Sequence, residues 1–207
     1  MKTLAVSRQF EYMLEKCRAV EGPDGDGSYH VDRVGELAYH IALALGIAPG
    51  QALELGLASK IHDIGKTAVD PHILDKSGRL TQEECEAVRK HTVLGAEIIS
   101  AHKDSIFDQA WKIALFHHER WDGAGYPHGL KEKNIPLSAR ITAVADSLDV
   151  MTHRRPYKAS WPAEVAIENL VADSGKQFDP EIIWVVAVRP YTFLQRICKV
   201  EAESFLG

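Results

Sequence analysis

Hydrophobic residues recur three or four positions apart along most of this chain, the spacing that places side chains on one face of an α-helix. A clear run follows His30 and ends at Gly46. Its apolar positions are Val31, Val34, Leu37, Ala38, Ile41, Ala42 and Leu45. No stretch alternates apolar and polar residues well enough to predict a strand. The pattern predicts an all-α fold, a single-domain bundle of about seven or eight helices.

Two predicted helices begin with residues typical of helix N-termini. Thr81 and Glu84 form the capping-box pattern, and another helix begins after Pro49. The residues of that helix expected to face inward are Leu53, Leu57 and Ile61. The predicted helices cover residues 4–20, 30–45, 49–61, 81–99, 105–118, 137–151, 161–173 and 180–188.

Length and composition are those of one globular domain. Of the 207 residues, 45% are hydrophobic and 26% are charged, which suits one well-buried core and is too short for two ordinary domains. The Gly/Asp-rich segment near residues 22–28 breaks the helical pattern. We therefore expect an N-terminal helix and linker over 1–29, a main domain over 30–188 and a C-terminal tail over 189–207.

Charge and cysteine content limit the classes of function. The formal net charge of −5 argues against binding duplex nucleic acid through a broad basic face, although a few local cations could still hold a small phosphate ligand. No apolar run of about 18 residues and no signal-peptide pattern is found, so no membrane association is expected. The three cysteines are far apart and form no CxxC pair, which favours a reduced, cytoplasmic setting.

Histidine is the unusual component, with ten copies. His117 and His118 are adjacent, and neighbouring helical side chains point about 100° apart, so one face cannot bury both in an apolar core. Each candidate, taken singly, is better explained as a hydrogen-bonded polar residue. The whole set needs a common cause, because clustered buried imidazoles and carboxylates require a compensating cation, and a metal centre is the simplest one. The set is His30, His62, Asp63, His91, His117, His118 and Asp146.

Three segments carry a family resemblance. The order of His30, the His62-Asp63 pair and Asp146 resembles the HD phosphohydrolase superfamily. The segments HDIGK at 62–66, HHERWDGAGYP at 117–127 and RPYK at 155–158 look like the HD-GYP subfamily. The resemblance implies an HD-domain-like helical fold and a metal-dependent phosphodiesterase. This enzyme would hydrolyse cyclic di-GMP to pGpG, and further to GMP, by attack of a hydroxide that bridges two metal ions.

The resemblance also implies residue roles. The seven residues of the set would hold two or three divalent ions, usually iron or manganese, with Asp63 bridging two of them; the donor types suit nickel or zinc as well. Lys66 would act with Asp63 in catalysis. Substrate phosphates or guanine edges would be contacted by Lys66, Asp149, Arg155 and Lys158. Lys66 would supply a point charge and Arg155 a planar fork for these phosphates.

A third metal ion is a separate hypothesis. Some members of the family bind it through an acidic residue four positions before the first histidine and a histidine after the HD pair. Asp26 occupies the first position, where a longer glutamate is expected, and His72 suits the second. The order Asp70-Pro71 inverts the one expected in that loop, so the geometry around His72 stays open.

The loop that follows His118 is expected to form the rim of the site. Gly123 and Gly125 permit backbone angles that other residues resist, while Tyr126 and Pro127 stiffen the turn. This rim would face the substrate or a protein partner.

The sequence leaves several alternatives open. Glu119 and Asp122 could orient metal ligands or cap the loop through backbone N–H groups. The chain could be a binding module in which the loop docks a partner such as a diguanylate cyclase domain, or a hydrolase of another nucleotide such as cyclic GMP-AMP, since fold alone cannot choose. A homodimer is also compatible with the sequence.

Overall fold

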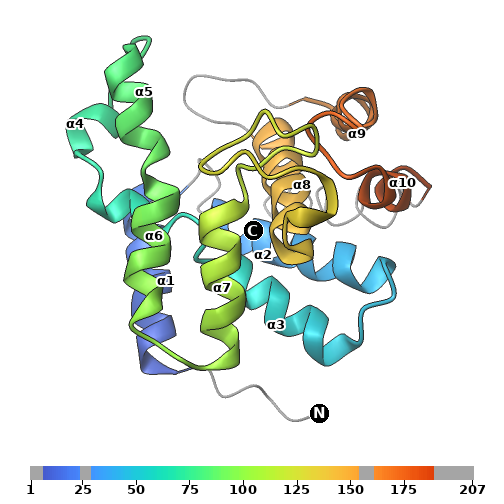
Figure 1. Ribbon diagram of the computed structural model, residues 1–207, viewed down its shortest axis with the longest axis horizontal. Coiled ribbons are helices and arrows are strands. Elements are labelled where there is room, and N and C mark those ends of the chain that lie inside the picture. The colour runs from blue at the N-terminus through green and yellow to red at the C-terminus, as the bar shows by residue number, and fades with distance from the viewer. Residues whose placement is uncertain (1–6, 24–28, 154–160, 189–207) are drawn as a thin grey trace, which may run out of the picture.

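The computed structural model describes residues 7–23, 29–153 and 161–188. These residues form ten α-helices and two short 3-10 helices, η1 and η2, with no strand (Figure 1). The α-helices are α1 (Arg8–Glu21), α2 (His30–Ala44), α3 (Pro49–Ser59), α4 (Pro71–Leu74), α5 (Gln82–Arg89), α6 (His91–Ser100), α7 (Ser105–Phe116), α8 (Leu137–Thr152), α9 (Ala163–Ala172) and α10 (Pro180–Val188). The 3-10 helices are η1 (Ile64–Ala68) and η2 (Glu132–Asn134).

The predicted all-α fold is confirmed, and the number of helices differs for two local reasons. The helix predicted over 81–99 is α5 followed by α6, with a turn at Lys90 between them. The segment after Asp70, predicted as a loop, contains the single-turn helix α4, whose first backbone groups are capped by the Asp70 side chain. The predicted capping box of Thr81 and Glu84 is present at the start of α5.

Two hydrophobic clusters form the core. One joins α2, α3, α8, α9 and α10, and includes Ile41, Leu148 and Leu170. The other joins α1, α6, α7 and η1 with Val31 of α2 and Ala58 of α3, and the rings of Phe10 and Phe107 are centred 6.2 Å apart. In Figure 1, α8 lies between α7 and the pair α9 and α10, and α1 runs behind α6. The helix α1 thus shares a core with segments of the predicted main domain.

The inward face predicted for α3 is wrong at Leu53, which is 37% exposed, whereas Leu55 is 5% exposed. The reason is a close crossing of α2 and α3 at two glycines. A Cβ at Gly35 would lie 2.7 Å from the backbone oxygen of Gly56, and the reverse contact is equally short. This crossing turns the face with Ala52 and Leu55 toward α2 and leaves Leu53 at the surface.

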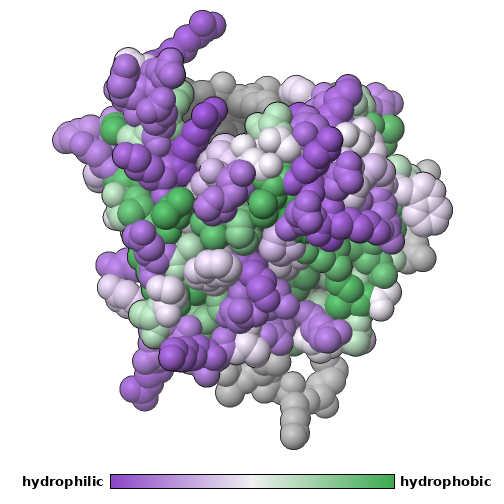
Figure 2. Space-filling view, in the orientation of Figure 1, coloured by the Kyte–Doolittle hydropathy of each residue, from purple (hydrophilic) through white to green (hydrophobic). Residues whose placement is uncertain are grey.

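The surface is mixed in character. Figure 2 shows hydrophilic side chains over most of the face viewed, interrupted by smaller apolar areas. Within the described part of the chain, none of the helices combines the length and the apolar character needed to cross a bilayer.

Candidate metal centre

The His62-Asp63 pair lies in the turn between α3 and η1. The helix α3 ends at Ser59, whose hydroxyl donates to the backbone oxygen of Leu55 and bonds to Thr142 on α8. The following turn brings both side chains into the interior, where His62 is fully buried and Asp63 is 6% exposed. An ionisable pair at this depth requires charged or hydrogen-bonding neighbours.

The Asp63 group consists of Asp63, His91, His117 and His118, each with one donor atom within 4.8 Å of the others. Asp63 Oδ1 lies 3.1 Å from His91 Nε2 and 3.6 Å from His117 Nε2. The two imidazole Nε2 atoms are 3.5 Å apart. Three elements therefore converge here: the turn before η1, the start of α6 and the C-terminal end of α7.

The His30 group consists of His30, His62 and Asp146, again with one donor atom of each within 4.8 Å of the others. His30 begins α2, and its Nε2 atom lies 3.1 Å from Asp146 Oδ1 on α8. His62 Nε2 lies 3.3 Å from Asp63 Oδ2, so the two groups adjoin at the His62-Asp63 pair. The structure brings all seven predicted ligands into these two groups.

Backbone carbonyls orient three of the imidazoles. The Nδ1 atom of His62 lies 2.9 Å from the oxygen of Ser59, that of His91 2.6 Å from Val88, and that of His117 2.9 Å from Ile113. A carbonyl can only accept, so Nδ1 carries a proton in each ring and Nε2 faces the group interior. This arrangement is typical of metal-binding histidines, whose second nitrogen is fixed by a hydrogen bond.

The residues fit divalent cations. Among the described side chains, His62 Nε2 and Asp63 Oδ1 are buried polar atoms without a hydrogen-bond partner. Leaving a buried acceptor unsatisfied costs about 1–3 kcal/mol, and more when the group is charged. Ions bound by the two groups would satisfy both atoms, and imidazole with carboxylate is a donor set that iron, manganese, nickel and zinc accept.

The protonation of the Asp63 group suits metal binding. Burial alone would raise the pKa of Asp63, but Lys66 and His62 beside it hold this pKa well below its usual range. Burial lowers the pKa of His117, and burial together with His117 lowers the pKa of His118 far below the ordinary value. The carboxylate is thus ionised and both imidazoles are neutral at neutral pH, as metal ligands must be.

In the His30 group, the pKa of His30 is raised, in contrast to the lowered pKa values of His117 and His118. Burial opposes the charge of His30, but its contacts with Asp146 and Asp149 raise its pKa to about 10. The Nδ1 atom of His30 lies 2.6 Å from Asp149 Oδ2, while Nε2 faces Asp146. Without an ion, a proton on His30 offsets part of the charge of these carboxylates, and a bound cation would take its place.

Asp149 lies beside the His30 group and is 1% exposed. Besides His30, its carboxylate accepts hydrogen bonds from the Arg33 guanidinium at 2.7 and 3.0 Å and lies 3.0 Å from His153 Nδ1. The family motif implies a substrate contact for Asp149, and Arg33 lies outside the residues predicted from the sequence. The available signal was an arginine three positions after His30, on the same buried face of α2.

Lys66 in η1 lies at the edge of the Asp63 group. Its ammonium donates to Asp63 Oδ2 at 2.6 Å and to Glu21 Oε1 at 2.8 Å. Burial opposes this charge, but Asp63 and Glu21 raise the pKa of Lys66 above its ordinary value. Glu21 is not among the predicted site residues, because it lies on α1, before the glycine-rich segment.

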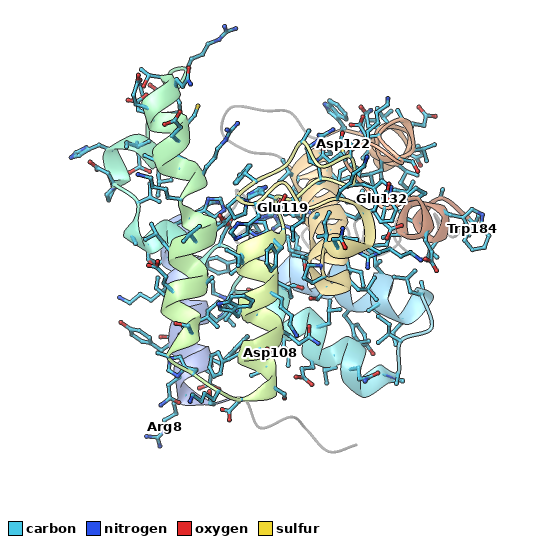
Figure 3. All side chains as sticks on the ribbon, viewed as in Figure 1. Arg8, Asp108, Glu119, Asp122, Glu132 and Trp184 are labelled. Atoms are coloured by element: carbon cyan, nitrogen blue, oxygen red, sulfur yellow. The ribbon has the colours of Figure 1, made fainter. Side chains whose placement is uncertain are left out.

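Glu119 and Asp122 cap the loop. Glu119 is 4% exposed and accepts from the backbone N–H of His128 at 2.7 Å and of Leu130 at 3.0 Å. Asp122 pairs with Arg120 and accepts from the N–H of Ala124. Figure 3 shows Glu119 between α7 and the loop, and Asp122 on the loop's side nearer α9. Of the two readings, the contacts favour capping.

The loop covers His118. The Tyr126 ring stacks on the His118 imidazole with centroids 4.8 Å apart, and the Arg89 guanidinium lies 5.2 Å from the centre of the Tyr126 ring. A Cβ at Gly125 would overlap the backbone of Arg120, so this position accepts only glycine without a shift. The segment containing Gly123, Gly125, Tyr126 and Pro127 thus borders the site.

The remaining predicted residues lie elsewhere. His72 is exposed on α4 and belongs to neither group. Asp26, Arg155 and Lys158 lie outside the described residues.

A bundle of helices that encloses two adjoining His/Asp groups defines a candidate metal-dependent protein. The family model of the HD domain matches residues 4–182, so this chain belongs to the HD-domain family, as the sequence motifs predicted. It is 46% identical over 154 residues to a cyclic di-GMP phosphodiesterase of Thermotoga maritima, covering 74% of this chain and 42% of that protein. It is 37% identical over 191 residues to the cyclic di-GMP phosphodiesterase response regulator RpfG of Xanthomonas campestris, covering 92% and 50%. The chain thus spans half or less of the length of these relatives.

Solved structures support the fold. A cyclic GMP-AMP-specific phosphodiesterase of Vibrio cholerae, V-cGAP3, superposes with a TM-score of 0.64 at 18% identity, covering 95% of this chain and 53% of that one. The HD domain of Listeria monocytogenes PgpH, solved with cyclic di-AMP, gives a TM-score of 0.60 at 19% identity, covering 91% and 96%. At these identities the likeness concerns the fold alone.

Proposed function

We propose that this chain hydrolyses cyclic di-GMP to pGpG and then to GMP. The observation that carries the proposal is the pair of ligand groups that adjoin at His62 and Asp63. When bound, two divalent ions would offset the charge of a phosphodiester and lower the pKa of an attacking water. The relatives named cyclic di-GMP phosphodiesterases support this substrate.

Individual residues take distinct roles in this proposal. The seven clustered residues hold the ions, with Asp63 facing both groups. Lys66, beside Asp63, donates to a phosphate oxygen, and Arg155 and Lys158 hold the dinucleotide. For Asp149, its buried contacts with His30 and Arg33 favour orienting the ligand His30 over contacting the substrate.

The proposed metals are two ions of iron or manganese. Nickel and zinc suit the same donors. Elemental analysis of anaerobically purified protein should count two ions per chain at full activity. A third ion that disappears in His72→Ala would instead support the trinuclear site with Asp26.

The activity is tested by separating the products of a short incubation of the metal-loaded protein with cyclic di-GMP. We expect pGpG to accumulate first, and Asp63→Asn to abolish turnover. The matched control is Asp108→Asn, on the exposed side of α7, where the carboxylate is 64% exposed. Absence of both products with fully loaded wild-type protein would contradict the proposal.

A second candidate substrate is cyclic GMP-AMP. The chain is 38% identical over 177 residues to the 3′3′-cGAMP-specific phosphodiesterase 2 of Vibrio cholerae, covering 86% of this chain and 34% of that protein. Comparing kcat/KM for the two dinucleotides distinguishes the candidates, because that ratio measures discrimination directly.

We also propose a compartment and a docking surface for this chain. The free thiols of Cys17 and Cys85 support a reducing, cytoplasmic compartment. The loop over residues 123–127 is the proposed docking surface for a partner such as a diguanylate cyclase domain.

A further inference from the structure

Glu21 is the last residue of α1, and its carboxylate points into the molecule. The side chain is 13% exposed, and Oε1 accepts a hydrogen bond from Lys66 Nζ at 2.8 Å. The chain leaves the helix at Gly22, whose φ of 70° is an angle that glycine adopts readily. This abrupt end keeps Glu21 within the helical turn that faces η1.

Lys66 is thereby held between two carboxylates, Asp63 at 2.6 Å and Glu21 at 2.8 Å. An ammonium group has three N–H donors. Two acceptors fix its orientation and leave one donor for another anion. Lysine has a flexible four-carbon stem, so a single acceptor would leave the ammonium much freer to rotate.

We propose that Glu21 is a positioning residue that aims the third donor of Lys66 at the substrate phosphate. The proposal rests on the proposed function, in which Lys66 binds that phosphate. It makes α1 part of the catalytic apparatus, although the sequence pattern separates this helix from the HD motif.

The contacts of α1 allow this role to be separated from helix docking. Arg18 donates twice to the Asp32 carboxylate at 2.8 Å, and Lys60 donates to the same carboxylate at 2.8 Å. Phe10, Met13 and Cys17 are buried in the core. Removal of the Glu21 carboxylate therefore leaves α1 attached.

The interaction of Glu21 with Lys66 is mutual. Glu21 Oε2 is buried and has no hydrogen-bond partner among the described residues, so the Lys66 ammonium provides the contact that offsets its charge. Two residues that act through each other have non-additive effects in a double-mutant cycle. A purely structural Glu21 would have additive effects.

The kinetic test compares Glu21→Ala, Lys66→Met and the double variant as metal-loaded full chains. Glu21→Ala should lower kcat for cyclic di-GMP about 10–100-fold, with KM and metal content close to wild type. In the Lys66→Met background the same change should alter kcat less than about 2-fold. The control is Glu15→Gln, on the exposed face of α1, which should match wild type. Equal losses in both backgrounds, or an unchanged kcat in Glu21→Ala, would overturn the proposal.

A second measurement is independent of activity. In metal-free protein labelled with 15N-lysine, the Lys66 ammonium should give a protected resonance in wild type and Glu15→Gln, identified by its absence in Lys66→Met. We expect Glu21→Ala to remove that protection, and an unchanged resonance would reject the positioning role. If wild type hydrolyses no cyclic dinucleotide, the proposed function fails, while the resonance still decides whether Glu21 holds Lys66.

Discussion

The Asp149 carboxylate is shared by three cationic or protonatable groups, His30, Arg33 and His153. Asp149→Asn keeps the shape but removes the charge that the buried Arg33 contacts. Breaking a buried ion pair from one side costs roughly 3–5 kcal/mol, which should appear in urea unfolding. Because His30 loses its orienting partner, metal affinity should also fall about 10–100-fold.

The exposed Asp108→Asn is the control for that variant, and its stability should stay within about 0.5 kcal/mol of wild type. The same pair of variants tests the role that the motif implies for Asp149. Unchanged stability and metal affinity, combined with a raised KM for the dinucleotide, would restore Asp149 as a substrate contact.

Asp32 on α2 forms a pH-dependent charged contact with two cations, Arg18 of α1 and Lys60 after α3. Burial opposes its ionisation, but these two cations lower the pKa of Asp32 below its ordinary 3.8. A carboxyl whose pKa is lower in the folded state stabilises the fold above its unfolded pKa, and this contribution is lost as the pH falls through the folded value.

Asp32→Asn should therefore be less stable than wild type at pH 7, and the difference should shrink as the pH falls below 3.8. Urea midpoints of both proteins across this range measure the effect. A stability difference that stays constant down to pH 2 would show that the charge of Asp32 is not its cause.

The close approach of η1 to α6 sets the distance between Asp63 and His91. A Cβ at Gly65 would overlap the backbone oxygen of His91 and lie 2.5 Å from the backbone nitrogen of Gly95. Backbone atoms cannot rotate away as a side chain can. Gly65→Ala should therefore push the two elements apart, at a cost of roughly 1–3 kcal/mol, and weaken metal binding.

Gly50→Ala is the matched control, because a Cβ at this position near the start of α3 meets no atom within 4 Å. Chemical unfolding and metal titration of the two variants give the comparison. Wild-type metal affinity in Gly65→Ala would mean that the contact does not set the geometry of the site.

Helical contacts also explain which features the sequence could predict. The seven predicted ligands meet in space because each lies on an inward face or at an end of a helix, which local spacing reveals. The exposed Leu53 was missed because two glycines, Gly35 and Gly56, decide which face of α3 meets α2, and glycines carry no hydrophobic signal. Likewise, Glu21 and Lys66 are 45 positions apart, so no local pattern pairs them.

The candidate metal centre joins elements of the two hydrophobic clusters. His30 and Asp146 come from α2 and α8, which contribute mainly to one cluster, while His91 and His117 come from α6 and the end of α7, which contribute to the other. Ions bound to both groups would link these halves. Their removal should therefore destabilise the whole fold and not only the site.

Binding of a ligand to the native state alone stabilises it by about 4.1 kcal/mol at 1,000 times its Kd. For a chain of this length, each kcal/mol shifts Tm by about 2–4 °C. Chelation should lower Tm accordingly, and added manganese should restore it, as followed by circular dichroism. Asp63→Asn, which lacks the carboxylate facing both groups, should respond much less to the chelator. An unchanged Tm in wild-type protein shown by elemental analysis to be metal-free would mean that the helices alone hold the halves together.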